Sequence, residues 1–137
     1  MSADSAFFDS NVLVYLTDDA SGKSGRTEDL LADGGVISVQ VMNEFANVAR
    51  RKVQLSWPET RDFLNTFRVT LEIVPMTLET HERGLDLAEQ YSLSVYDGMI
   101  VAAALLAGCT TLYSEDMHDG LIIEGLTIRN PYAASGN

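Results

Sequence analysis

The segment Val95-Tyr96-Asp97-Gly98-Met99-Ile100-Val101-Ala102-Ala103-Ala104-Leu105-Leu106-Ala107 decides the fold class of this chain. Placed on a helix, it carries apolar side chains on nearly every side, and a helix of that kind is buried. Gly108 follows directly and is typical of a helix C-terminus. The apolar run within the segment is much shorter than the ~20 residues that cross a bilayer. We therefore expect a helix in the core of a globular domain.

Short apolar runs and helical segments alternate along the rest of the chain. Runs typical of buried strands occur at residues 6–8, 36–39, 71–74 and 110–113, with a weaker one at 126–129. Helices are expected at 39–53, 56–68, 78–91 and 95–107, the first three capped by Ser38, Ser56 and Thr77. This alternation predicts an α/β fold with a parallel central sheet and helices on both faces. We expect a single domain over residues 1–132 and a disordered tail over 133–137.

The composition narrows the function classes. The chain has 137 residues, of which 20 are acidic and 9 are Lys or Arg, so its formal net charge is −11. This balance argues against a nonspecific nucleic-acid binder, because such proteins normally present a basic surface. The single cysteine, Cys109, excludes an intramolecular disulfide and fits a reducing compartment. Residues 1–9 lack the features of a signal peptide. These observations predict a cytoplasmic protein without a membrane segment.

Acidic residues stand near the ends of the predicted strands. Asp9 follows the first run, Glu44 lies in the helix after the second, Asp97 opens the buried helix, and Asp116 follows the fourth strand-like run. Each has a local structural explanation. Asp9 or Asn11 can cap a helix, and Asp97 can complete a cap with Ser94. Glu44 can lie on a solvated helix face. Asp116 can belong to a surface loop.

A parallel sheet gives these acids a second interpretation. The carboxyl ends of its strands lie at one edge, where α/β proteins bind ligands, so Asp9, Glu44, Asp97 and Asp116 can converge there. Clustered carboxylates raise one another's pKa unless a cation neutralises them. Oxygen-only ligands favour Mg²⁺ or Mn²⁺ over zinc, and such ions activate water and stabilise charge on a phosphodiester. The pattern therefore predicts metal-dependent phosphodiester hydrolysis.

These motifs resemble the PIN domain family and, within it, the VapC-type toxins of bacterial toxin–antitoxin pairs. The resemblance runs from about Phe7 to Asn130 and is carried by Phe8-Asp9-Ser10-Asn11-Val12-Leu13-Val14-Tyr15, Asn43-Glu44-Phe45, Tyr96-Asp97-Gly98-Met99-Ile100-Val101-Ala102-Ala103-Ala104 and Leu112-Tyr113-Ser114-Glu115-Asp116-Met117. It implies a three-layer α/β sandwich and an endoribonuclease that uses Mg²⁺, or Mn²⁺, to hydrolyse RNA. It also implies a homodimer and a cognate antitoxin protein that enters the acidic cleft.

The resemblance also assigns individual residues. Asp9, Glu44, Asp97 and Asp116 match the acidic quartet, and Asp9, Asp97 and Asp116 are the expected metal ligands. Asn11 and Ser114 match polar positions beside the metal's water shell, and Asp119 is a candidate fifth acid. Glu115 stands where many members carry Arg or a neutral residue, so the choice of Asp116 rests on its spacing from the strand. Gly98 replaces a frequent alanine, which should loosen the helix start by at most ~1 kcal/mol.

Other features leave alternatives open. The run Arg50-Arg51-Lys52 is a candidate RNA-binding segment, but basic residues also suit a helix C-terminus. A noncatalytic PIN-like module that binds RNA or protein is the alternative function. A phosphatase with an aspartyl nucleophile fits less well, because Asn11 stands where a second Asp is expected. Ser21-Gly22-Lys23-Ser24 mimics the end of a P-loop, but Thr17 replaces the required glycine, so we predict a flexible, solvated loop.

Overall fold

The strands of the computed structural model, which describes residues 5–133, form one sheet in the order β3-β2-β1-β4-β6-β5. They are β1 (Ala6–Phe8), β2 (Val36–Ser38), β3 (Glu72–Val74), β4 (Thr111–Tyr113), β5 (Ile122–Ile123) and β6 (Leu126–Arg129). All neighbouring strands pair in parallel except β5 and β6, which are antiparallel. The prediction of a mostly parallel α/β sheet is confirmed.

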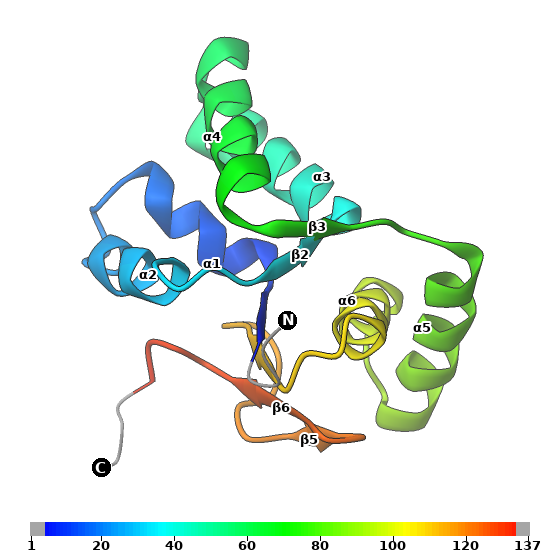
Figure 1. The fold of residues 1–137 in the computed structure, drawn as a ribbon. Helices are drawn as coiled ribbons and strands as arrows, with labels where there is room; N and C mark the ends of the chain where they lie inside the picture. The colour runs from blue at the N-terminus through cyan, green and yellow to red at the C-terminus, as the bar shows by residue number, and fades with distance from the viewer. Residues whose placement is uncertain (1–4, 134–137) are drawn as a thin grey trace.

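Helices connect the strands and cover both faces of the sheet. They are α1 (Ser10–Val14), the 3₁₀ turn η1 (Tyr15–Thr17), α2 (Ser24–Leu31), α3 (Val39–Val48), the π turn η2 (Ala49–Val53), α4 (Trp57–Thr70), α5 (Leu78–Tyr91) and α6 (Val95–Leu106). Figure 1 shows α1 and α2 on one side of the sheet and the α5–α6 hairpin on the other, with α3 and α4 standing above β2 and β3. This arrangement gives the three layers that the sequence predicts.

The buried helix α6 holds the core together, as its apolar sequence predicts. Its residues from Gly98 to Ala104 are all buried. Gly98 allows α6 to approach α5 closely, because a Cβ atom at this position would lie 2.3 Å from the carbonyl oxygen of Gly84. The glycine therefore serves helix packing, and its cost in helix propensity is offset by the close contact between the two helices.

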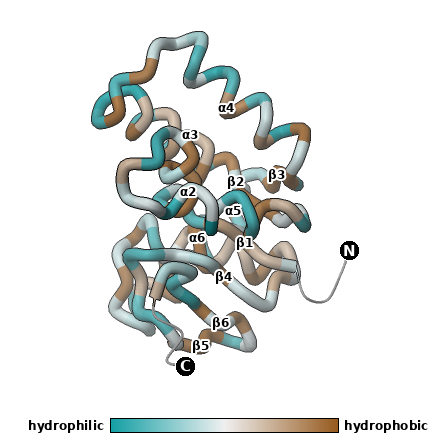
Figure 2. Tube along the Cα trace, turned by 90° about the vertical axis from the view of Figure 1, so that its left-hand side faces the viewer, coloured by the Kyte–Doolittle hydropathy of each residue, from teal (hydrophilic) through white to brown (hydrophobic). Residues whose placement is uncertain are grey.

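Side-chain caps define the starts of the long helices. Ser38, Ser56, Thr77 and Ser94 each accept a hydrogen bond from a backbone N–H in the first turn of α3, α4, α5 and α6 respectively. Ser56 and Glu59 form the complete capping box that the sequence predicts. Figure 2 shows hydrophobic residues of α4 alternating with hydrophilic ones, as expected of a helix that buries only one side.

Two local expectations are wrong in part, and one strand was not predicted. The segment predicted as a flexible loop at Ser21–Ser24 is in part ordered structure, because α2 begins at Ser24 and Lys23 is half-buried. The helix predicted over 39–53 is α-helical only to Val48 and ends in the π turn η2. The short strand β5 was not predicted, because Gly120 and Gly125 bracket a run of only a few apolar residues.

The described part of the chain, residues 5–133, contains no helix with the length and apolar character needed to cross a membrane. Of the predicted disordered tail, only Ala133 belongs to these residues, where it forms a bend. Residues 134–137 lie outside the described part.

Candidate active site

Asp9 lies directly after β1, at the carboxyl edge of the sheet, and is 4% exposed. Its Oδ1 accepts a hydrogen bond from the Ser10 N–H at 2.7 Å and so caps α1. Its Oδ2 accepts from Ser114 Oγ at 2.8 Å and from Asn11 Nδ2 at 3.3 Å. The N-cap interpretation of Asp9 is therefore correct, and the same carboxylate also belongs to a polar cluster.

Ser114 connects this carboxylate to the loop after β4. The side chain is fully buried, and its Oγ accepts from the backbone N–H of Asp116 at 3.3 Å and of Met117 at 3.4 Å. Asn11 Nδ2 also reaches Ser114 Oγ, at 3.4 Å. The structure thus places both predicted polar neighbours, Asn11 and Ser114, in contact with Asp9.

Glu44 approaches the same edge from α3. Its Oε1 accepts from Ser10 Oγ at 3.0 Å, and its Oε2 accepts from Gln40 Nε2 at 3.1 Å. The same Gln40 amide donates to the backbone carbonyl of Tyr96, one residue before Asp97, at 3.1 Å. Ser10 and Gln40 were not predicted as site residues. Their signals in the sequence are position alone, next to Asp9 and one helical turn before Glu44.

Asp97 stands in the first turn of α6, where its backbone N–H donates to Ser94 Oγ at 3.1 Å. Within residues 5–133, the Asp97 carboxylate has no described hydrogen bond from the Ser94 backbone N–H. The capping box suggested by Ser94-x-x-Asp97 is therefore only half formed. The Asp97 side chain is partly buried, while Asp116 is exposed.

Burial and neighbouring acids raise the pKa of two of the four acids, Asp9 and Asp97. Burial is the main reason that the pKa of Asp9 rises to about 6, and the charges of Glu44 and Asp97 raise it further, against the hydrogen bonds from Ser114 and Ser10. Burial also raises the pKa of Asp97, and the charge of Asp116 adds to this effect. Asp9 therefore lies within electrostatic range of Glu44 and Asp97, and Asp97 within range of Asp116.

The donor set fits a hard divalent cation. Its candidate ligands are all oxygen atoms, and the raised pKa values of Asp9 and Asp97 would be relieved by a positive charge. Across the described residues 5–133, no three His, Cys, Asp or Glu side chains are close enough to hold an ion together directly. Mg²⁺ keeps several of its waters in proteins and needs only one or two direct carboxylate ligands. The acids at this edge suit a hydrated ion of that kind.

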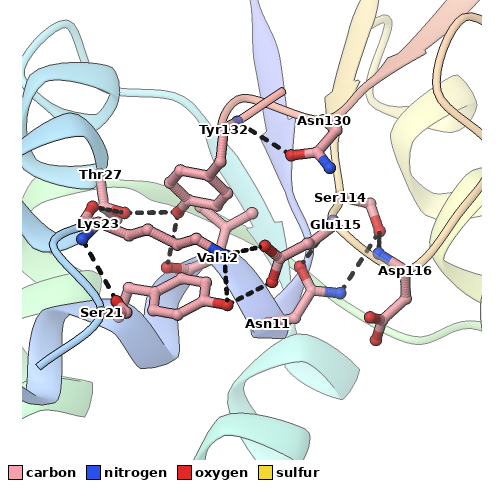
Figure 3. A network of polar contacts seen from close by, with 11 residues as sticks. Asn11, Val12, Ser21, Lys23, Thr27, Ser114, Glu115, Asp116, Asn130 and Tyr132 are labelled. Atoms are coloured by element: carbon pink, nitrogen blue, oxygen red, sulfur yellow. Dashed lines mark hydrogen bonds and ion pairs between the residues drawn. The ribbon is translucent and has the colours of Figure 1, made fainter. Parts of the chain in front are cut away.

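Two neighbouring acids have other partners. Asp119 Oδ1 accepts from the Asn130 N–H at 2.8 Å, at the end of β6, and the contacts described for the quartet do not include it. Glu115 forms an ion pair with Lys23 and a hydrogen bond with Tyr15. Figure 3 shows the Glu115 carboxylate directed toward Lys23 while Asp116 extends away from it.

The candidate RNA-binding run lies in η2, at the far end of the helix that carries Glu44. Arg50 is held by the protein itself: Nη1 donates to the Leu55 carbonyl at 2.6 Å, and the guanidinium carbon lies 4.4 Å from the centre of the Trp57 ring. Arg51 and Lys52 are exposed. The structure therefore separates the run into one packed side chain and two that face solvent.

Comparisons with known proteins agree with this fold. The family model described as PIN domain matches residues 6–118. A toxin–antitoxin complex from Klebsiella pneumoniae superposes with a TM-score of 0.71 and 23% identity, covering 95% of this chain and 100% of that one. VapC20 of Mycobacterium tuberculosis, a toxin that cleaves the sarcin–ricin loop, superposes with a TM-score of 0.69 and 16% identity, covering 82% and 90%.

A third similar structure is VapBC2 of Rickettsia felis bound to a DNA fragment from its promoter. It has a TM-score of 0.65 and 21% identity, and the match covers 90% of this chain and 96% of that one. At these identities the structural likeness establishes a shared fold. Among curated proteins, none matches the sequence.

Proposed function

Because this chain belongs to the PIN domain family, we propose that it is a metal-dependent endoribonuclease that acts as the toxin of a toxin–antitoxin pair. The observation that carries the proposal is the electrostatic coupling of Asp9 to Glu44 and Asp97, and of Asp97 to Asp116, at the carboxyl edge of the sheet. Ligand sites of α/β proteins lie at this edge. The toxins and toxin–antitoxin complexes among the similar structures support the same function.

In this proposal, Asp9, Asp97 and Asp116 hold Mg²⁺ or Mn²⁺, directly or through water. When bound, such an ion lowers the pKa of water and stabilises the negative charge that develops on a phosphodiester. Asp9 is fixed for this role by hydrogen bonds from Ser10, Asn11 and Ser114. These donors also favour its ionised form.

Glu44 has a separate role, which is to orient water at the site. The hydrogen bonds from Ser10 Oγ and Gln40 Nε2 fix its carboxylate between the starts of α1 and α6. Each carboxylate oxygen has more than one lone pair, so Glu44 retains acceptor capacity for a water molecule. Asn11 and Ser114 act as positioning residues for Asp9.

The helical arm formed by α3, η2 and α4 supplies the positive charge that an RNA substrate requires. Five of the nine basic residues of the chain fall between residues 50 and 68, where only Glu59 and Asp62 are acidic. Arg51, Lys52, Arg61 and Arg68 are all exposed. We assign phosphate contacts chiefly to Arg51 and Lys52, because Arg50 is already engaged by Leu55 and Trp57.

The assembly and its cellular setting belong to the same proposal. A homodimer would place a second basic arm near the acidic edge, and a cognate antitoxin with cationic side chains would complement the surplus of acids there. The net charge of −11 makes weak nonspecific affinity for RNA an expected property of the free protein. We assign the protein to the cytoplasm, where its substrate would be found.

A cleavage assay tests the function. Purified protein is incubated with total RNA in Mg²⁺, in Mn²⁺ and in EDTA, and the cleaved ends are sequenced. We expect discrete cuts that require a divalent cation and disappear in Asp9→Asn, whose fold is checked by circular dichroism. Wild-type protein that binds RNA but never cuts it with either ion would instead support the noncatalytic binding module. Full activity in Asp9→Asn would contradict the assignment of the quartet.

A further inference from the structure

A cluster of four side chains lies beside the acidic edge and contains none of the quartet. We call Tyr15, Lys23, Glu115 and Tyr132 the lysine clamp. Its members come from η1, the residue before α2, the loop after β4 and the segment after β6, so it joins four separate parts of the chain. Figure 3 shows the Lys23 side chain extending past Tyr132 toward Glu115.

Lys23 is the centre of this clamp. Its Nζ forms an ion pair with Glu115, donates to the Tyr15 hydroxyl at 3.2 Å, and lies 4.8 Å and 5.1 Å from the centres of the Tyr15 and Tyr132 rings. The Tyr15 hydroxyl itself donates to Glu115. A cation held by a carboxylate and two aromatic faces is stabilised more than an isolated surface ion pair.

The clamp continues by hydrogen bonds into the candidate metal site. The backbone N–H of Glu115 donates to Asn11 Oδ1 at 3.1 Å, and Asn11 Nδ2 donates to Asp9 Oδ2 at 3.3 Å. Asp116 follows Glu115 in the loop after β4, so contacts that hold Glu115 also restrain the backbone of Asp116. The path from Lys23 to Asp9 therefore passes through Glu115 and Asn11 alone.

We propose that Lys23 is a positioning residue for the metal site, acting through Glu115 to fix Asn11, Asp9 and the loop that carries Asp116. The inference rests on the metal-dependent function proposed above. It also explains the acid at position 115: paired with Lys23 and Tyr15, the Glu115 carboxylate is directed out of the quartet and anchors the loop.

Loss of Lys23 should change the affinity for a divalent cation in opposite directions, depending on whether the residue acts through its charge or by positioning other groups. The two roles can therefore be told apart. Removing a cation near a cluster of acids, and leaving Glu115 unpaired, increases the negative potential at the site and should strengthen the binding of a divalent cation. If Lys23 instead acts by positioning, its removal weakens binding. Loss of an outer partner of a metal ligand typically lowers affinity roughly 10–100-fold.

The experiment measures Mn²⁺ affinity by isothermal titration calorimetry on metal-free full-length protein. We expect Lys23→Met to weaken binding about tenfold and Lys23→Arg to restore most of the loss, because arginine keeps the ion pair and the aromatic contacts. The matched control is Arg83→Met, which breaks the other described ion pair, Arg83–Glu124, between α5 and the β5–β6 turn. Its Mn²⁺ affinity should equal that of the wild type.

Glu115→Gln provides a second variant that keeps the size of the side chain and does not depend on the folding of Lys23→Met. It should also weaken Mn²⁺ binding, as the loss of its negative charge alone would. The double variant separates the two causes: combining Glu115→Gln with Lys23→Met should add little if both act through one contact, whereas pure charge effects would offset each other. Equal or tighter Mn²⁺ binding in the folded variants would overturn the inference and leave the proposed function intact. A wild-type protein that binds no Mn²⁺ would contradict the proposed function, and this inference with it.

Discussion

Ser114 Oγ donates a hydrogen bond to Asp9 Oδ2 at 2.8 Å, across 105 positions of sequence and inside the core. The contact joins the ends of β1 and β4, which pair in parallel with Phe8 opposite Tyr113. The same hydroxyl accepts from the backbone of Asp116 and Met117. One buried hydroxyl therefore orients a candidate ligand and folds the loop that carries another.

Replacing this hydroxyl should damage both stability and metal binding. We expect Ser114→Ala to lower the free energy of unfolding by about 1–3 kcal/mol, because the backbone N–H of Met117 loses its acceptor in the core and that of Asp116 loses one in a part-buried place. Mn²⁺ binding should weaken in parallel. Urea unfolding and calorimetric titration measure the two effects separately.

Thr77→Ala is the matched control for this variant. Thr77 caps α5 by accepting from the Thr80 N–H, and it lies outside the acidic edge. Its loss should cost about 1 kcal/mol of stability without changing Mn²⁺ affinity. A loss of Mn²⁺ affinity in Thr77→Ala equal to that in Ser114→Ala would show that general destabilisation explains both.

The buried carboxylate of Asp9 should make the metal-free protein more stable in mild acid. Its pKa is about 6 in the folded protein, against 3.8 for an ordinary Asp. The folded state therefore binds more protons than the unfolded state between these values, so stability rises as pH falls through this window. From pH 7 to pH 5 the gain should be roughly 1 kcal/mol.

Urea unfolding in EDTA at pH 7 and pH 5 measures this gain. Asp9→Asn removes the titrating group and should abolish most of the pH dependence, with a smaller part remaining from Asp97, whose pKa is also raised. A wild-type protein that loses stability between pH 7 and pH 5 would contradict the assigned burial of an ionised Asp9.

Gly98 tests how far local propensity governs the position of Asp97. Alanine is favoured over glycine within a helix by up to ~1 kcal/mol, yet a Cβ at Gly98 would meet the Gly84 carbonyl oxygen at 2.3 Å. We therefore expect Gly98→Ala to destabilise the protein by about 1–3 kcal/mol. Thermal unfolding of Gly25→Ala serves as the control, because Gly25 lies in α2 and a Cβ atom there would have nothing within 4 Å of it. That variant should gain a few tenths of a kcal/mol or more, and a stabilised Gly98→Ala would show that α5 and α6 can separate freely.

The acids and the parallel arrangement of the strands around them could be anticipated because both have local sequence signals. Asp9 directly follows an apolar run, and a parallel sheet brings such strand ends to one edge. Ser114 was assigned by the family resemblance instead, and it follows β4, the strand that pairs with β1. What a single sequence did not reveal was which hydrogen bonds join these residues.

Elements that depend on distant partners escaped sequence reasoning. Helix α2 buries only Thr27 completely and has a glycine as its second residue, so it has little apolar periodicity to recognise. Lys23 and Glu115 are in contact although 92 positions separate them in the sequence. No local pattern distinguishes that pair from two solvated charges. The role of Gly98 likewise depends on its contact with Gly84 in the neighbouring helix α5. Long-range packing decides these features, and their sequence signals are weak.

The split within the basic run gives a final prediction for RNA binding. Arg51→Ala combined with Lys52→Ala should leave stability unchanged, because both side chains are exposed, and should weaken binding of a catalytically inactive Asp9→Asn protein to single-stranded RNA. The slope of log affinity against log salt should fall by roughly 0.7 for each phosphate that the variant no longer neutralises. Arg50→Ala should instead destabilise the fold, because it removes the interactions with Leu55 and Trp57.

Fluorescence anisotropy at several salt concentrations measures the slope, with Arg83→Ala as the control for the removal of a positive charge elsewhere. A slope that changes equally in Arg83→Ala would indicate a diffuse effect of net charge. An unchanged slope in the double variant would show that Arg51 and Lys52 do not contact the RNA.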